Sequence, residues 1–389
     1  MTRVGERFEF ATATRIVFGR GALEQAGSLA KSLGKRALIV GGRSAARNEA
    51  LLDRLKEQKI ESFAFSIVGE PTTDAVRQGV EAARSADCDF VIGFGGGSAI
   101  DAAKAIGALL TNPGDLFDYL EVVGRGQPLP HPAAPIMAVP TTAGTGAEVT
   151  RNAVLAAPEA RVKASLRGPS LLPRVALIDP SLTDRLPPEL TATTGLDALT
   201  QLIEPYVCNR SNPLTDGFCR EGLQMVARSL QRAHAGGANE MARDDMACAS
   251  LLGGLALANA GLGAVHGFAA PIGGAFPVPH GAVCAALLAP VMECNVSALR
   301  ERAPKSEPIA RYQAIAALLT GQPGASIEDG LAWIRELCVA LGIRGLRTFG
   351  LTTDAIPDLV EKAGRASSMK ANPIALTQRE LSDALGRAL

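Results

Sequence analysis

The first half of the chain alternates short apolar runs with longer amphipathic segments, and this alternation limits the folds that it can adopt. Five runs rich in β-branched and aromatic residues predict buried strands, at 37–42, 61–68, 89–95, 136–142 and 175–179. Ala, Leu and charged residues at helical spacing predict helices at 47–58, 73–85 and 98–110. Strands that alternate with helices form a parallel sheet covered by helices, so the sequence predicts an α/β domain.

The sequence changes character after Pro180. From Leu190 onward it is rich in Ala and Leu at helical periodicity and offers no convincing strand, which predicts an all-helical domain. The paired prolines 187–188 resist helix formation, so the hinge is placed between about Asp179 and Pro188. Because 389 residues are enough for two cores, we expect an α/β domain over residues 1–183 and an all-α domain over 184–389.

The charge balance and the N-terminus exclude several kinds of partner. Lys plus Arg and Asp plus Glu number 39 each, and no block of like charges forms a basic arm, so nucleic acid and anionic membranes are poor partners. The N-terminus has no apolar signal-peptide core, and no uncharged apolar run reaches the roughly 18 residues of a membrane span, so we expect a cytoplasmic protein. The seven cysteines form no CxxC pair, so most should act as small buried hydrophobes.

The segment GGGSAIDAAK, residues 95–104, joins a predicted strand to a predicted helix. Glycines at a helix N-terminus leave backbone N–H groups open at the positive end of the helix dipole, which attracts a phosphate group. Ser98 is placed to act as the N-cap, and Asp101 as the acid of a capping box. The alternative is a plain tight turn, and residues 93–98, GFGGGS, fit the usual GxGxxG fingerprint only with serine in the last place.

A second polar loop favours the phosphate interpretation. PTTAGTGAEVT, residues 140–150, follows the end of another predicted strand and supplies Thr141, Thr142 and Thr145. Sheets of α/β proteins bind ligands at the carboxyl ends of their strands, so the two loops predict one shared nucleotide site.

Four residues of the helical half have side chains suited to a divalent metal ion. Asp197 and Gln201 are four residues apart and therefore share one helix face. His266 and His280 flank a segment rich in Gly and Pro. One carboxylate and two imidazoles suit Fe²⁺ or Zn²⁺, with Oε1 of Gln201 as a weak fourth ligand. Taken singly, each of the four also fits an ordinary structural or surface role.

Ordered motifs along nearly the whole chain resemble the iron-containing (group III) alcohol dehydrogenases, which are related to glycerol dehydrogenase and dehydroquinate synthase. The matching segments are VFGRGAL, VGEPTTD, GGGSAIDAAKA, PTTAGTGAEVT, ALIDP, TGLDALTQLIE, VHGFAAPIGG and PHGAVCAALL. The resemblance implies an N-terminal α/β dinucleotide-binding domain, a C-terminal all-α metal domain, and a substrate site in the cleft between them.

The resemblance also implies which residues bind the cofactor and the metal. Besides Gly42, after the first predicted strand, the expected cofactor contacts are Gly96, Gly97, Ser98, Asp101, Thr141, Thr142, Thr145, Asn152 and Lys163. Asp197, His266 and His280 match three of the family's four metal-ligand positions and are the expected catalytic residues.

Three departures from the family bear on these expectations. The family usually has histidine where this chain has Gln201, and an amide binds metal more weakly, so the metal affinity falls or the metal is absent. Ala270 stands where many members have a histidine for proton transfer, so the proton must pass through solvent, a substrate group or the cofactor ribose. Arg43 and Ser44 follow the first strand where many NAD-using members have an acid, which favours NADP(H).

These features predict reversible hydride transfer between NAD(P)(H) and an alcohol or aldehyde, assisted by a divalent metal. Because of Gln201, the chain is placed close to maleylacetate reductase-like members, and a metal-independent reductase of that kind is the first alternative. A dehydroquinate synthase-like lyase and a nucleotide-binding sensor with a decayed site are the others. Phe268, Phe276 and Val278 suggest an apolar pocket for a small or medium substrate, and family habit implies a homodimer.

Overall fold

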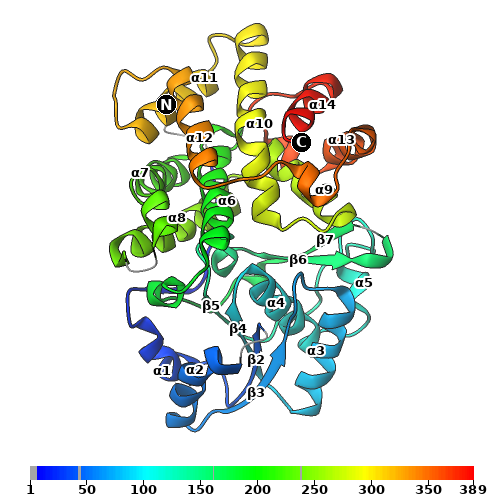
Figure 1. Cartoon of the computed structure of the whole chain (residues 1–389). Helices are drawn as coiled ribbons and strands as arrows, with labels where there is room; N and C mark the ends of the chain where they lie inside the picture. The colour runs from blue at the N-terminus through cyan, green and yellow to red at the C-terminus, as the bar shows by residue number, and fades with distance from the viewer. Residues whose placement is uncertain (1–6, 43–44, 161, 237–238) are drawn as a thin grey trace. The chain divides into compact units, whose positions relative to one another are not determined.

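The computed structural model describes residues 7–42, 45–160, 162–236 and 239–389, which form two compact units (Figure 1). The α/β unit comprises Ala11–Thr142 and Gly146–Asp184. The helical unit comprises Arg185–Leu389 together with Ala143–Thr145 and residues 7–10. The chain therefore passes from the first unit to the second next to the paired prolines, where Pro188 begins helix α6 (Pro188–Val207).

The α/β unit is built on a six-stranded sheet in which all adjacent strands are parallel. The strand order is β1 (Arg15–Phe18), β8 (Val175–Ile178), β5 (Ile136–Pro140), β4 (Phe90–Gly95), β2 (Arg36–Gly41) and β3 (Glu61–Ser66). All residues of β4 and β5 are buried. Strands covered on both faces need apolar side chains on both faces, which is why these segments read as continuous apolar runs.

Helices cover both faces of this sheet. They are α1 (Ala26–Ala30), α2 (Ala45–Glu57), α3 (Thr73–Ser85), α4 (Gly97–Thr111) and the short α5 (Leu116–Tyr119). Successive residues of β2 point into different cores, because side chains alternate along a strand. Leu38 packs in the cluster that holds residues of α3 and α4, whereas Ile39 packs in the cluster that holds residues of α1 and α2.

The five predicted strands and three predicted helices of this unit are confirmed, with ends that shift by at most two residues. Two features are additional. β1 is a short strand at the edge of the sheet, and β6 (Asn152–Ala157) pairs with β7 (Val162–Arg167) in an antiparallel hairpin outside it. Short 3₁₀ helices lie at Ala22–Gln25, Ala147–Val149, Pro158–Ala160, Pro169–Leu171, Pro180–Thr183, Leu346–Phe349, Thr353–Ala355 and Ser368–Ala371.

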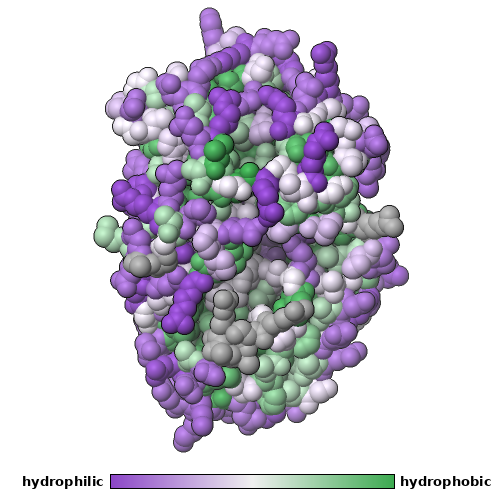
Figure 2. All heavy atoms as spheres, viewed as in Figure 1, coloured by the Kyte–Doolittle hydropathy of each residue, from purple (hydrophilic) through white to green (hydrophobic). Residues whose placement is uncertain are grey.

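The helical unit contains no strand among its described residues, as predicted. After α6 come α7 (Pro213–Ala235), α8 (Glu240–Asn259), α9 (Ala264–Ala275), α10 (His280–Arg302), α11 (Glu307–Thr320), α12 (Ile327–Ala340), α13 (Ile356–Arg365) and α14 (Gln378–Arg387). One large apolar core joins them. Outside the cores, hydrophilic side chains cover much of the face drawn in Figure 2, with smaller apolar groups among them.

Helix α10 is long and apolar enough to pass a membrane-span test, with a mean hydropathy of 1.7, but 78% of that window is buried inside the protein. Helices α8 and α9 pass the test only as a pair, bent by 96°. A buried helix at the centre of a helical core has this composition for packing reasons. The apolarity of α10 is therefore that of a core helix.

A buried polar cluster ties helix α4 to the β6–β7 hairpin. Lys104 is fully buried, and its Nζ donates to Oγ1 of Thr150 at 2.8 Å and to the carbonyl oxygen of Asn152 at 2.9 Å. Asp101 accepts a hydrogen bond from the backbone N–H of Val154 at 3.0 Å. The cluster satisfies polar groups that burial would otherwise leave costly.

Glu148, 2% exposed, interacts electrostatically with Lys104. Burial raises the pKa of Glu148 to about 7, from an ordinary value of 4.5, and the backbone N–H and Lys104 only partly offset this rise. Between pH 4.5 and about pH 7, Glu148 keeps its proton in the folded chain and has lost it in the unfolded chain. The free energy of unfolding therefore falls as pH rises through this range.

We therefore expect Glu148→Gln to remove this loss. A shift of this size corresponds to about 3 kcal/mol between pH 5 and pH 8. Urea unfolding at several pH values should show the variant gaining stability relative to wild type as pH rises, while Glu159→Gln, an exposed acid of the same unit, should follow the wild type. Parallel curves for Glu148→Gln and wild type would contradict the pKa shift.

Candidate functional site

Helix α6 brings Asp197 and Gln201 onto one buried face, as the four-residue spacing predicts. The two residues are 1% and 2% exposed. Gln201 hydrogen bonds to the Asp197 carboxylate, which leaves Oε1 of Gln201 and Oδ1 of Asp197 buried without a hydrogen-bond partner. Buried polar atoms are rarely left unpaired, so these two oxygens are available to a ligand.

Both predicted histidines lie against Asp197. His266 is in the first turn of α9, and His280 is the first residue of α10. Nε2 of His266 is 3.3 Å from Oδ1 of Asp197, and Nε2 of His280 is 3.6 Å from the same oxygen. Cys284 joins them, and one donor atom from each of the four residues lies within 4.8 Å of every other. We call these four residues the donor cluster.

Glu204, one further turn along α6, fixes the orientation of His266. Its Oε2 lies 2.7 Å from Nδ1 of His266, and its Oε1 accepts the backbone N–H of Val265 at 2.7 Å. When Nδ1 donates its proton to Glu204, Nε2 of the neutral ring carries a lone pair that faces Oδ1 of Asp197. Two lone pairs at this distance repel unless a proton or a metal cation lies between them.

Asn372 supports the same helix end from the other side. Its Oδ1 accepts the backbone N–H of Ala264 at 3.1 Å, and its Nδ2 donates to Oδ1 of Asn295 at 2.7 Å. Gly263 fits because a Cβ there would lie 2.8 Å from Oε1 of Glu204. The first N–H groups of α9 are thus capped by buried side chains, which holds His266 in place.

The pKa values of the donor cluster show that it favours positive charge. Burial lowers the pKa of His280, but Cys284 and Asp197 outweigh burial and raise it to about 9. The pKa of His266 is raised well above its ordinary range, because Cys284, Glu204 and Asp197 together outweigh its burial. Burial raises the pKa of Asp197, but His280 and His266 bring it below its ordinary value.

The donor cluster therefore fits a divalent cation. It offers a carboxylate oxygen, two imidazole nitrogens and a sulfur, which is a donor set that zinc and iron accept. The ring of His266 is also hydrogen-bonded to the carboxylate of Glu204, and metal-binding imidazoles usually have such a partner.

Sequence reasoning missed Cys284 and Glu204. Cys284 follows His280 by four residues, and Glu204 follows Gln201 by three, so both spacings place them on the metal-facing side of their helices. That spacing was the available signal. The sequence predicted that most of the cysteines are small buried hydrophobes because they form no CxxC pair.

The glycine turn has the predicted place but a different cap. Helix α4 begins at Gly97 directly after β4, and its N-cap is Gly96, which has no side chain to cap the helix. The expectation of Ser98 as N-cap is therefore wrong, and the carboxylate of Asp101 turns instead to Val154. Without a side-chain cap, the first N–H groups of α4 stay available to an anion.

The second polar loop lies beside the first. The backbone N–H of Thr141 donates to the carbonyl of Gly95 at 2.9 Å, and a Cβ on Gly96 would lie 3.3 Å from Oγ1 of Thr142. Gly42 follows β2, and β2 pairs with the edge of β4 opposite to β5. The predicted cofactor contacts at 42, 96–98, 141 and 142 thus gather at the carboxyl ends of three adjacent strands.

The remaining expected cofactor contacts have other partners or other places. The carbonyl of Asn152 accepts from Lys104, and Nζ of Lys163 pairs with Oε1 of Glu70 at 2.9 Å. Thr145 belongs to the helical unit. Arg43 and Ser44, on which the NADP(H) expectation depends, lie outside the described residues.

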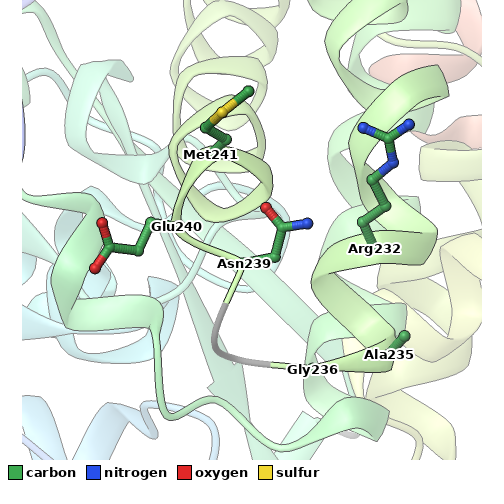
Figure 3. Close-up of a pocket in the computed structure, with 6 residues that line it drawn as sticks. All are labelled: Arg232, Ala235, Gly236, Asn239, Glu240 and Met241. Carbon is green, nitrogen blue, oxygen red and sulfur yellow. The ribbon is translucent and has the colours of Figure 1, made fainter.

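Two expected pocket residues are core residues instead. Phe268 is fully buried and Val278 is 4% exposed, and both pack in the core of the helical unit, with the half-buried Phe276 against it. A surface depression at the turn between α7 and α8 lies apart from the donor cluster, and its labelled side chains do not converge on one point (Figure 3). Arg232, Ala235, Gly236, Asn239, Glu240 and Met241 line it.

Comparison with known proteins places the chain in a family. Residues 13–180 match the iron-containing alcohol dehydrogenase model, and residues 191–389 match the C-terminal model of the Fe-containing alcohol dehydrogenase family. The chain belongs to the iron-containing alcohol dehydrogenase family. Over 388 residues it is 36% identical to the 1,3-propanediol dehydrogenase of Klebsiella pneumoniae, covering 96% of this chain and 97% of that protein.

Other relatives agree. Alcohol dehydrogenase 4 of Saccharomyces cerevisiae is 35% identical, with 94% of each chain covered. A crystal structure of a 1,3-propanediol oxidoreductase superposes with a TM-score of 0.91 at 34% identity, covering 99% of this chain and 100% of that one. A sulfoacetaldehyde reductase from Bifidobacterium kashiwanohense, solved with NAD⁺, gives a TM-score of 0.85 at 29% identity, with 98% of each chain covered.

This dehydrogenase therefore has the predicted fold and transfers hydride between NAD(P)(H) and an alcohol or aldehyde with the help of a metal. The expected closeness to maleylacetate reductases is corrected, because the relatives that match at 35–36% identity over nearly the whole chain are 1,3-propanediol dehydrogenases and yeast alcohol dehydrogenase 4. The lyase and sensor alternatives give way to the dehydrogenase for the same reason.

Glu204→Gln tests the support of His266. The amide cannot hold the imidazole as a carboxylate does, so we expect a roughly 10- to 100-fold loss of metal affinity. Equilibrium dialysis with Zn²⁺ measures this loss. Glu189→Gln, an exposed acid on the same helix, is the matched control and should bind as wild type does. Equal affinity in the Glu204 variant would show that the carboxylate does not support the metal site.

Gly96→Val tests the glycine turn. The backbone there (φ −74°) suits an L-residue, and a Cβ would lie 3.3 Å from Oγ1 of Thr142, so the new side chain would crowd the second polar loop next to the open N–H groups of α4. We expect the Kd for NADH, measured by fluorescence, to rise by at least about tenfold, which is roughly 1.4 kcal/mol. Zinc content should not change, because the donor cluster lies in the helical unit. An unchanged Kd would place the diphosphate elsewhere.

Proposed function

We propose that this enzyme interconverts small primary alcohols or diols with their aldehydes, using a divalent ion held by Asp197, His266 and His280. The observation that carries the proposal is the buried donor cluster, in which Nε2 of His266 and Nε2 of His280 lie 3.3 and 3.6 Å from the same oxygen of Asp197. The named relatives support the substrate class, since they include 1,3-propanediol dehydrogenases and a choline dehydrogenase of Bacillus subtilis.

The chemistry divides between the two units. A divalent ion, when bound, acts as a Lewis acid that polarises an aldehyde carbonyl and lowers the pKa of an alcohol hydroxyl. Asp197, His266 and His280 hold it, and Glu204 keeps the lone pair of His266 turned inward. The α/β unit holds the diphosphate of the cofactor at the N-terminus of α4.

A bound nicotinamide cofactor would supply or accept the hydride of the substrate carbon at its C4. Ala270, one turn after His266 on α9, carries no proton-transferring group, so the hydroxyl proton leaves through solvent, a substrate group or the cofactor ribose. The expected substrate cleft between the domains stays a prediction.

We also propose that both coenzymes are accepted. A relative solved with NAD⁺ and the NAD-dependent methanol dehydrogenase of Bacillus methanolicus support NAD(H). The absence of an acid at Arg43 and Ser44 supports tolerance of the 2′-phosphate of NADP(H). Initial rates measured with NADH and with NADPH test whether both are accepted.

A cytoplasmic homodimer completes the proposal. Seven cysteines that form no disulfide suit a reducing compartment. The dimer is inferred from the family resemblance, and sedimentation of the purified protein tests it.

A metal-independent, maleylacetate reductase-like activity is the second candidate. It follows from Gln201, which replaces an imidazole by an amide. The donor cluster weighs against it, because four donors gather without counting Gln201.

Metal removal separates the two candidates. We expect chelation to lower turnover of ethanol, 1-butanol and 1,3-propanediol by at least about 100-fold, because a Lewis acid contributes several kcal/mol to such a step. Zn²⁺ should restore the activity, followed through the absorbance of NADH or NADPH. NADH binding is the control and should survive chelation. The proposal would be contradicted if the chelated enzyme turned over alcohols as fast as the untreated enzyme, or if it turned over maleylacetate without metal.

A further inference from the structure

Cys284 occupies the position that completes the donor cluster. Its side chain is fully buried, one turn after His280 on the same face of α10. Its Sγ lies 3.7 Å from Nε2 of His280 and 3.9 Å from Nε2 of His266. Among the described residues, the donor cluster includes no other cysteine.

The distances within the donor cluster fit a tetrahedral ion. Bonds of about 2.0–2.1 Å to nitrogen or oxygen and about 2.3 Å to sulfur require donors about 3.4 Å apart, or about 3.6 Å when one donor is sulfur. The two nitrogen–oxygen distances are 3.3 and 3.6 Å. The two nitrogen–sulfur distances are 3.7 and 3.9 Å, so all four lie within a few tenths of an ångström of the tetrahedral values.

We propose that Cys284 is the fourth protein ligand of the metal, in place of Gln201, and that the site selects Zn²⁺ over Fe²⁺. The proposal rests on the proposed function, since it concerns the same metal. Gln201 donates to Asp197 and positions that carboxylate. The exchange of an imidazole for an amide at one position is thus offset by a sulfur at another.

Charge balance supports this assignment. The donor cluster is buried, and a buried charge needs compensation. With Asp197 and the Cys284 thiolate as ligands, two negative charges neutralise the two positive charges of the ion. With Asp197 and the neutral Gln201, one positive charge would remain uncompensated.

The sulfur also decides which metal binds. Thiolate is a soft ligand that favours Zn²⁺ and Co²⁺, and the general order of affinities already places Fe²⁺ below both. A site with one thiolate, two imidazoles and one carboxylate therefore retains zinc in competition with iron.

Cobalt substitution tests the ligand directly. A thiolate bound to Co²⁺ gives a charge-transfer absorption in the near ultraviolet that nitrogen and oxygen ligands do not give. Chelated wild-type protein loaded with Co²⁺ should show this band at one equivalent, and Cys284→Ser should lose it. Cys294→Ser, a buried cysteine on the same helix outside the donor cluster, is the matched control and should keep it.

Competition between Zn²⁺ and Fe²⁺ tests the selectivity. We expect Cys284→Ser to lower zinc affinity by more than the 10- to 100-fold typical of an outer-shell change, and to reduce the preference for zinc. A wild-type cobalt spectrum without the band, or a band that Cys284→Ser leaves unchanged, overturns the ligand assignment even if Cys284→Ser fails to fold, because the first result needs no variant.

The two proposals fail differently. Alcohol turnover by a cobalt enzyme that lacks the band leaves the proposed function standing and removes Cys284 from the metal. A strong band that Cys284→Ser removes, in an enzyme that turns over no alcohol, supports the ligand and removes the proposed function.

Discussion

The structure of the metal centre depends on the contact between Asp197 and His266. A carboxylate oxygen of Asp197 and Nε2 of His266 face each other at 3.3 Å in a buried place, and the carboxylate oxygen has no other hydrogen-bond partner there. When Nδ1 of His266 donates its proton to Glu204 on the far side of the ring, the contact repels unless a second proton or a metal cation lies between the two atoms. The packed helices hold the two side chains in this position. A bound cation would remove the repulsion between them.

Each unit has a helix N-terminus next to its site, but the backbone N–H groups of the two helices have different partners. In the α/β unit, the N-terminus of α4 presents N–H groups and no capping side chain, so it attracts an anion. In the helical unit, the first two N–H groups of α9 donate to Asn372 and Glu204, so they are not available to an anion. Whether a helix start binds a ligand or anchors a catalytic side chain is thus set by one or two capping residues.

Much of the fold could be predicted from the sequence, because strands buried on both faces give long apolar runs. β1 was missed because it has only four residues at the sheet edge, and β6 because its small alanines do not look like a strand. Asp197, His266 and His280 were found from residue type and spacing. Cys284 and Glu204 were not, because their roles depend on how α6, α9 and α10 pack together, which a single sequence does not show.

The central claim is that the donor cluster holds one divalent ion in each chain. Titration of chelated protein with Zn²⁺ in a calorimeter, with the Tm followed in parallel, tests it most directly. The account predicts one tightly bound ion per chain and a higher Tm on binding, because an ion that binds only the folded state stabilises it. Titration without a binding event, and a Tm that zinc leaves unchanged, would contradict it.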